Sequence, residues 1–156
     1  MTAIAFTVVG TPVPQGSTAA FSRGGKIHTT NDPKGTINRW RGDVRGAAGP
    51  AIGAWTGPEL PLPGPVSMRL RFRFARPKSH FHPANSRRAV EELKADAPSW
   101  LAGTPDVDKL SRSILDALTA LVYVDDAQVV ALNATKRYVG EGERPGVDVV
   151  VEAIER

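Results

Sequence analysis

Four aspartates occur as two pairs in the stretch from residue 104 to residue 137. Asp106 and Asp108 stand one residue apart, and Asp125 and Asp126 are adjacent. The residues between the pairs have the pattern of one amphipathic helix, and a single chain reversal after it can return the second pair to the first. Carboxylates without a nearby histidine or thiol favour Mg²⁺ or Mn²⁺ over Zn²⁺. The pairs therefore predict a site for a hard divalent cation, which activates water for in-line attack on a phosphodiester.

The helix between the pairs is expected from about residue 107 to residue 121. Asp108, Arg112 and Asp116 follow one another at i, i+4 steps on one stripe, so Arg112 is expected beside the metal as a fixed cation that stabilises developing negative charge. Asp116 is expected to pair with Arg112. The alternative for the first acidic pair is that one aspartate only caps the helix after Pro105. The buried face is predicted to consist of Leu110, Ile114, Leu118 and Leu121.

The second acidic pair precedes an apolar run, residues 128–132, that reads as a strand. Alternation along a strand puts Asp125 and Asp126 on opposite faces, so only Asp126 is expected to join the cluster. Lys136 shares the parity of Asp126 but lies ten residues on, roughly 33 Å in a straight strand. Lys136 is therefore expected to be a remote phosphate contact or a surface lysine.

Composition excludes several classes of function. The 156 residues contain no cysteine, which excludes a disulfide framework, a zinc-thiolate site and a cysteine nucleophile. Neither a G-x-S-x-G nor a Walker A motif occurs. There is no apolar run of roughly 20 residues and no basic flank at the N-terminus, so a cytoplasmic protein without a membrane segment is expected. The net charge of +4 suits a polyanionic partner, although an ordinary basic protein explains it equally well.

Other segments supply the scaffold. A helix is predicted from about residue 34 to residue 48, capped by Asn31 or Asp32 and ended or kinked at Gly49-Pro50. Its buried stripe is Ile37, Trp40, Val44 and Ala47 or Ala48, and its arginines 39, 41 and 45 are expected to face solvent or DNA backbone. Strands are predicted at residues 3–9, 66–74 and 147–154, the last an inner strand because both faces are apolar.

The strand at residues 66–74 carries alternating arginines. Arg69, Arg71 and Arg73 point away from the apolar face and are spaced roughly 6.5–7 Å apart, close to the spacing of phosphates along DNA. An arginine-guarded solvent face is an equally good interpretation. The irregular, basic segment at residues 76–103 follows, and it is predicted to be a loop able to close over DNA.

A composite of motifs in this region carries a family resemblance. The motifs are Pro105-Asp106-x-Asp108-x-Leu110, Leu115-Asp116-Ala117-Leu118, Asp125-Asp126-x-Gln128-Val129 and Lys136. With them the chain resembles the RusA family of Holliday junction resolvases, endodeoxyribonucleases of bacteria and prophages. The family usually has asparagine at the position of Lys109 and a functional lysine at that of Arg112.

The resemblance implies a single α+β (α/β) domain over residues 1–156, with a small mixed sheet and two main helices. It implies a homodimer that cuts four-way DNA junctions symmetrically in a bacterial cell or a phage-infected host. Mg²⁺ would be held by Asp106, Asp108 and Asp126, with Arg112 also catalytic. Two alternatives are a non-catalytic branched-DNA-binding protein and a structural protein whose acidic turns are only caps. The residues assigned to DNA contact are Arg69, Arg71, Arg73, Arg76, Lys78, Lys109 and Lys136.

Overall fold

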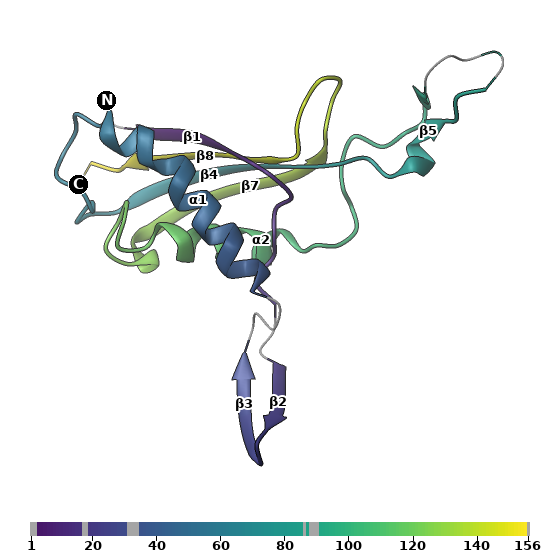
Figure 1. Cartoon of the computed structure of the whole chain (residues 1–156). Coiled ribbons are helices and arrows are strands. Elements are labelled where there is room, and N and C mark those ends of the chain that lie inside the picture. Colours follow the sequence, from purple (N-terminus) through teal and green to yellow (C-terminus); the bar gives the residue numbers. More distant parts are fainter. Residues whose placement is uncertain (1–2, 17–18, 31–34, 86, 88–90, 156) are drawn as a thin grey trace.

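Four strands form one mixed sheet, and both long helices lie on the same side of it (Figure 1). The outer strand β1 pairs antiparallel with β8, β8 pairs antiparallel with β4, and β4 pairs parallel with the edge strand β7. The computed structural model describes residues 3–16, 19–30, 35–85, 87 and 91–155. The strands are β1 (Ala3–Val9), β8 (Gly146–Ala153), β4 (Val66–Phe74) and β7 (Val129–Tyr138).

The core lies between the sheet and the helices α1 (Thr36–Gly53) and α2 (Val107–Leu118). The predicted stripes are confirmed, because α1 buries Ile37, Trp40, Val44 and Ala48 and α2 buries Leu110, Ile114 and Leu118. Leu121 is half-buried beyond the end of α2. The predicted α+β domain with a mixed sheet and two helices is therefore confirmed.

Helix α1 is longer than predicted and continues past Gly49-Pro50 to Gly53. The predicted end at this dipeptide is wrong, because Pro50 lies inside the helix on its exposed side. Ala51 and Ile52 continue the packing against the core. At the other end α1 begins at Thr36, and the predicted caps Asn31 and Asp32 with Pro33 lie outside the described residues.

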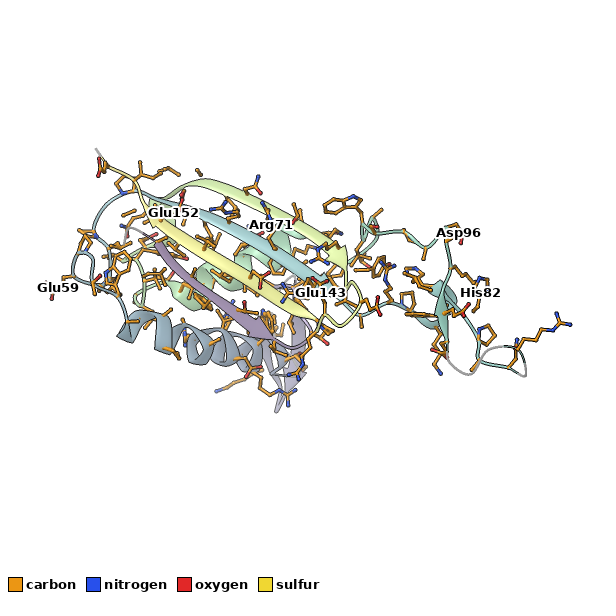
Figure 2. All side chains as sticks on the ribbon, turned by 90° about the horizontal axis from the view of Figure 1, so that it is seen from above. Glu59, Arg71, His82, Asp96, Glu143 and Glu152 are labelled. Carbon is orange, nitrogen blue, oxygen red and sulfur yellow. The ribbon has the colours of Figure 1, made fainter. Side chains whose placement is uncertain are left out.

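The central strands agree closely with the expectations. Strand β4 spans the predicted residues 66–74, and its Met68, Leu70 and Phe72 are buried. Strand β8 lies between β1 and β4, as predicted for an inner strand. Arg69 and Arg71 alternate with these residues and so belong to the opposite face, which no helix of the described residues covers. Arg71 is seen on that face in Figure 2.

Two small hairpins project from this body (Figure 1). One pairs β2 (Ala19–Arg23) with β3 (Lys26–Thr30), and Gly24 and Gly25, both with positive φ, form its two-residue turn. The other pairs β5 (Phe81–His82) with β6 (Glu92–Leu93), after the short 3₁₀ turn η1 (Lys78–His80). Among the described residues, no helix is both long and apolar enough to cross a membrane.

Candidate functional site

The first acidic pair lies at the N-terminal end of α2, and both aspartates are exposed. Asp106 occupies the N-cap position, but its side chain makes no capping hydrogen bond. Its carboxylate lies 3.4 Å from the ammonium of Lys109. The capping explanation is therefore wrong for Asp106, and the carboxylates at this helix end remain accessible to a ligand.

The N-terminal segment, residues 11–16, forms a wall beside Asp106. The backbone N–H of Gln15 donates to the carbonyl of Lys109 at 3.0 Å, and the hydroxyl of Ser113 donates to the carbonyl of Val13 at 2.8 Å. A cleft of about 600 Å³ lies between this wall and residues 104–109. Its lining is mostly apolar, with Asp106 and Lys109 among the lining residues, so a substrate held here meets the carboxylate next to apolar surface.

Lys136 fixes the loop that leads into α2. Its ammonium donates to the carbonyl of Gly103 and, at 2.7 Å, to the carbonyl of Pro105. Lys136 is half-buried and lies next to the Asp106 loop, which differs from the expected remote contact. The sequence interpretation considered only the distance from Asp126 along the strand, whereas the contact with the Pro105 carbonyl places Lys136 beside Asp106.

The two aspartates of the second acidic pair, Asp125 and Asp126, have different contacts. Asp125 caps the 3₁₀ turn η2 (Asp126–Gln128), because its carboxylate accepts from the N–H of Ala127 at 2.8 Å. The side chain of Gln128 accepts from the N–H of Asp125 at 2.8 Å and completes a capping box. The expected alternation is wrong here, because the strand begins only at Val129. Asp126 is nevertheless the member of the pair that capping leaves available.

Asp126 lies among other acidic groups. A hydrogen bond with Asp125, partial desolvation and the negative charges of Asp125 and Asp116 raise the pKa of Asp126 above its ordinary value. Burial, together with the charges of Asp126 and Asp116, likewise raises the pKa of Tyr123, whose hydroxyl donates to the Leu115 carbonyl at 2.8 Å. A cation bound near Asp126 would relieve this repulsion.

Asp116 has a different partner from the one predicted. Its carboxylate accepts from the guanidinium of Arg41 on α1 at 2.8 Å, and Arg41 also donates to the side chain of Gln15 at 3.0 Å. Arg112 is exposed on α2 between Asp108 and Asp116. Arg41 therefore links α1, α2 and the wall of the cleft, a role that an exposed-face interpretation of the α1 arginines missed.

The two acidic ends of α2 are far apart within one chain. Lys136 marks the Asp106 end, and Val129, which follows Asp126 and η2, lies seven residues earlier on β7. Seven strand residues span roughly 23 Å, and the twelve residues of α2 span about 18 Å. No group of three or more histidine and acidic side chains that could hold a metal occurs within the part of the chain that the structure describes. Within the described part of one chain, Asp126 therefore does not form such a group with Asp106 and Asp108, and the three-aspartate metal site stays a prediction.

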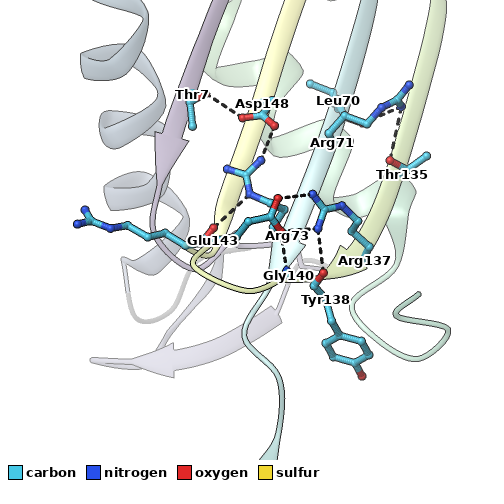
Figure 3. Close-up of polar contacts among 11 residues, drawn as sticks. Thr7, Leu70, Arg71, Arg73, Thr135, Arg137, Tyr138, Gly140, Glu143 and Asp148 are labelled. Carbon is cyan, nitrogen blue, oxygen red and sulfur yellow. Dashed lines mark hydrogen bonds and ion pairs between the residues drawn. The ribbon is translucent and has the colours of Figure 1, made fainter. Parts of the chain in front are cut away.

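The arginines of β4 are engaged on the helix-free face. Arg73 is buried, forms an ion pair with Asp148 and donates to the carbonyl of Arg144 at 3.1 Å (Figure 3). Arg71 donates to the side chain of Asn133 at 2.6 Å. Arg69 is exposed and lies 3.7 Å from Glu152. These pairs favour a mixed-charge sheet face over a continuous row of free guanidiniums.

The two basic residues that follow β4, Arg76 and Lys78, differ in their contacts. Arg76 donates to the carbonyls of Val139 at 3.0 Å and Pro98 at 2.7 Å, and its guanidinium lies 5.5 Å from the centre of the Tyr138 ring. Lys78 is exposed. Arg76 therefore anchors the loop, whereas Lys78 remains free to meet an anionic partner.

Similarity to known proteins covers almost the whole chain. Residues 10–152 match the family described as endodeoxyribonuclease RusA. The chain belongs to the RusA family. It is also 34% identical, over 155 residues and 99% of both chains, to the uncharacterized protein YqaN of Bacillus subtilis strain 168. The RusA match includes both acidic pairs, the cleft wall and Lys136.

Proposed function

We propose that the protein is a Mg²⁺-dependent, structure-selective DNA endonuclease that resolves four-way junctions. The observation that carries the proposal is the pair of exposed carboxylates, Asp106 and Asp108, at a helix end where neither serves as a side-chain cap in a chain of the RusA family. The adjoining cleft gives a DNA strand access to Asp106.

The residues at this end suit Mg²⁺, or Mn²⁺, as two members of a larger ligand set. Carboxylate oxygens are hard donors, and both side chains face solvent. When bound, the cation would activate water and stabilise the oxygens of an in-line phosphoryl displacement. Lys136 would hold the loop of Asp106 in place, and the exposed Arg112 would offset negative charge on the phosphate. Arg112 cannot act as a proton donor at neutral pH.

We infer that the third carboxylate comes from a second copy of the chain. A two-fold axis near the middle of α2 reverses the direction of the helix, so the partner's Asp126 end meets the first chain's Asp106 end. Each dimer then has two equivalent sites, as symmetric cleavage of a junction requires. The resemblance of the motifs to a homodimeric family agrees with this arrangement.

An apolar patch next to Asp126 supports contact with a second copy. Val124, Val130 and Leu132 are 56%, 64% and 45% exposed. Val130 and Leu132 face the helix side of the edge strand β7, since Leu132 pairs with the buried Met68 of β4. If the same surface of another chain covered this patch, apolar area would be buried beside Asp126. Asp126 is the carboxylate that we propose to complete the other chain's site at Asp106 and Asp108.

Mixing two inactive variants tests the function and the shared site together. Asp106→Asn and Asp126→Asn should each abolish cleavage of a synthetic four-way junction in Mg²⁺. When equal amounts are unfolded and refolded together, heterodimers contain one complete site, so about a quarter of the wild-type number of sites returns. The expected product is a junction nicked in one strand, visible on a denaturing gel.

The matched control is a mixture of Asp106→Asn with Asp108→Asn, which alter the same half of the site and should stay inactive. Full cleavage by either single variant would refute the metal assignment. If the single variants are inactive and mixing them restores no cleavage, all ligands come from one chain, and the shared site is refuted.

A second candidate, a non-catalytic binder of branched DNA, is favoured by one observation. The ammonium of Lys109, at a position where the family usually has asparagine, lies 3.4 Å from Asp106 and competes with a cation for its carboxylate. Wild-type protein that shifts junction DNA but leaves it uncut in Mg²⁺ and in Mn²⁺ would decide for this candidate. Recovery of cleavage in Lys109→Asn would show that the lysine is the cause.

A further inference from the structure

Trp100 presents an indole to solvent from a well-anchored backbone. Its side chain is 62% exposed, although the residues around it are fixed. The carbonyl of Ser99 accepts from the N–H of Tyr138 at 2.9 Å, and that of Pro98 accepts from Arg76 at 2.7 Å. Leu101 packs against the core. The exposure of Trp100 therefore does not result from a loose segment.

The indole extends the helix-free face of the sheet beyond β7. Trp100 forms an isolated antiparallel bridge with Arg137, and residues paired in this way point to the same face. Arg137 pairs in register with Arg73, whose guanidinium reaches Asp148 on that face (Figure 3). The indole is thus on the opposite side of the sheet from the helices.

The charges around Trp100 suit an anionic strand. The nearby carboxylate of Glu143 is bound by Arg137 through two hydrogen bonds of 2.6 and 2.7 Å. This ion pair and the N–H of Gly140 lower the pKa of Glu143 to about 2, so it remains ionised and engaged. Arg71 lies farther along the same face. The Glu143 carboxylate is therefore neutralised by Arg137, so a phosphate backbone passing here does not meet it as an unpaired negative charge.

Trp100 is also close in the chain to the candidate cleavage site. Six residue steps separate Trp100 from Asp106, which limits their separation to about 20 Å. One nucleotide strand advances 3.4 Å per step in duplex DNA, so the indole lies within about six nucleotides of a phosphate at Asp106. Arg137, the partner of Trp100, directly follows Lys136, which holds the Asp106 loop.

We propose that Trp100 stacks on an unpaired base near the branch point and so distinguishes branched DNA from duplex. The inference rests on the proposed function and adds a substrate-contacting residue to it. Bases within a duplex already stack on their neighbours, whereas a base at a branch point can leave the stack and expose its face. An exposed aromatic side chain stacks on any base, which suits selection by structure rather than by sequence.

The test is binding without cleavage, using a four-way junction with 2-aminopurine placed in turn at each of the six nucleotides on either side of the branch point. Ca²⁺ replaces Mg²⁺. Trp100→Ala should weaken junction binding about 5- to 150-fold and leave duplex affinity unchanged, because one stacking contact is lost. Trp100→Phe should retain most of the affinity. At one or more positions the 2-aminopurine emission should be lower with wild type than with Trp100→Ala.

Trp55→Phe is the matched control, since its indole donates to the carbonyl of Pro58 at 2.7 Å and has no place in the proposal. An unchanged junction affinity in Trp100→Ala overturns the inference, and so does an equal loss for duplex. A changed sedimentation coefficient in Trp100→Ala also overturns it, because a second chain would then cover the indole. Wild-type protein that binds junctions without cutting them refutes the proposed nuclease but leaves this binding test valid.

Discussion

The two ends of α2 carry similar acidic residues in different settings. At the N-terminal end, Asp106 and Asp108 are exposed, and Asp106 lines a cleft next to the loop that Lys136 holds. At the C-terminal end, Asp116 is tied to Arg41 and Asp125 is used in a capping box, so Asp126 alone remains available. Each end of α2 therefore has exposed carboxylates, and the described part of one chain does not bring the two ends together in one metal-binding group.

The same difference separates carboxylates that are available to a metal ion from carboxylates that stabilise the fold. A carboxylate that caps a turn or forms a short ion pair with an arginine of another helix is oriented by that contact, so it is a poorer candidate for a metal ligand than an exposed carboxylate. By this criterion we propose Asp106, Asp108 and Asp126 as the ligands, whereas Asp116 and Asp125 are engaged within the fold. Substitutions at the two ends should therefore give different kinds of defect.

The largest effect is expected for Asp108→Asn. Loss of one anionic ligand removes several kcal/mol of transition-state stabilisation, so junction cleavage should slow about a thousandfold at saturating DNA. Single-turnover cleavage of a labelled junction measures it. Asp43→Asn makes the same chemical change at an exposed position of α1 and should leave the rate unchanged. A defect in Asp108→Asn that excess Mg²⁺ does not alter, together with a lowered melting temperature, would indicate a structural role instead.

A smaller catalytic effect is expected for Lys136→Met. The methionine fills similar space but cannot hold the carbonyls of Gly103 and Pro105, so the loop of Asp106 becomes less ordered. Cleavage should fall about 10- to 100-fold, as for residues that orient a metal ligand, and the Mg²⁺ concentration for half-maximal rate should rise. Lys78→Met, at an exposed position of η1, is the control for the metal dependence: loss of a DNA contact there should leave the Mg²⁺ concentration for half-maximal rate unchanged. If Lys136→Met weakens DNA binding and leaves the metal dependence unchanged, Lys136 is a phosphate contact as the sequence suggested.

Stability, not metal affinity, should respond to Arg41→Ala. The substitution removes charge-assisted hydrogen bonds to Asp116 and Gln15 from a side chain that is 19% exposed. We expect the free energy of unfolding to drop by about 1.5–3 kcal/mol in urea denaturation. Arg39→Ala, two residues away and exposed, should change it by no more than about 0.5 kcal/mol. Equal effects of the two variants would mean that the Arg41 link does not hold the helices together.

The sequence predicts some features of α2 and its surroundings better than others. Periodicity located both helices' buried stripes and the full extent of β4, because the apolar spacing of one element is a local property. The acidic pairs could also be recognised, because each pair consists of residues that are close together in the sequence. The interpretation of Asp126 from strand alternation failed, since its surroundings form a capped 3₁₀ turn. The Asx-Asx-x-Gln pattern at residues 125–128 is compatible with that capping box and was the available signal.

Tertiary placement accounts for the remaining differences. The neighbourhood of Lys136 depends on α2 running antiparallel to β7, and the partner of Asp116 depends on how α1 packs on α2. Neither follows from spacing within one element. Trp100 gave no periodic signal, because its exposure results from a short segment that adds to the edge of β7.

The smallest expected effect concerns Glu143, which secures the β7–β8 connection at the Lys136 end. The pKa of Glu143 is lowered from 4.5 to about 2 by Arg137, so the fold favours its ionised form. The resulting stabilisation is present above pH 4.5 and is lost as the pH falls towards 2. Glu143→Gln should therefore be less stable than wild type at pH 7, by up to about 1 kcal/mol for so exposed a pair, and equally stable near pH 2. Urea denaturation across this range measures the difference. A gap that persists at pH 2 would mean that the amide disturbs packing or the hydrogen bond from Gly140, rather than removing an ion pair.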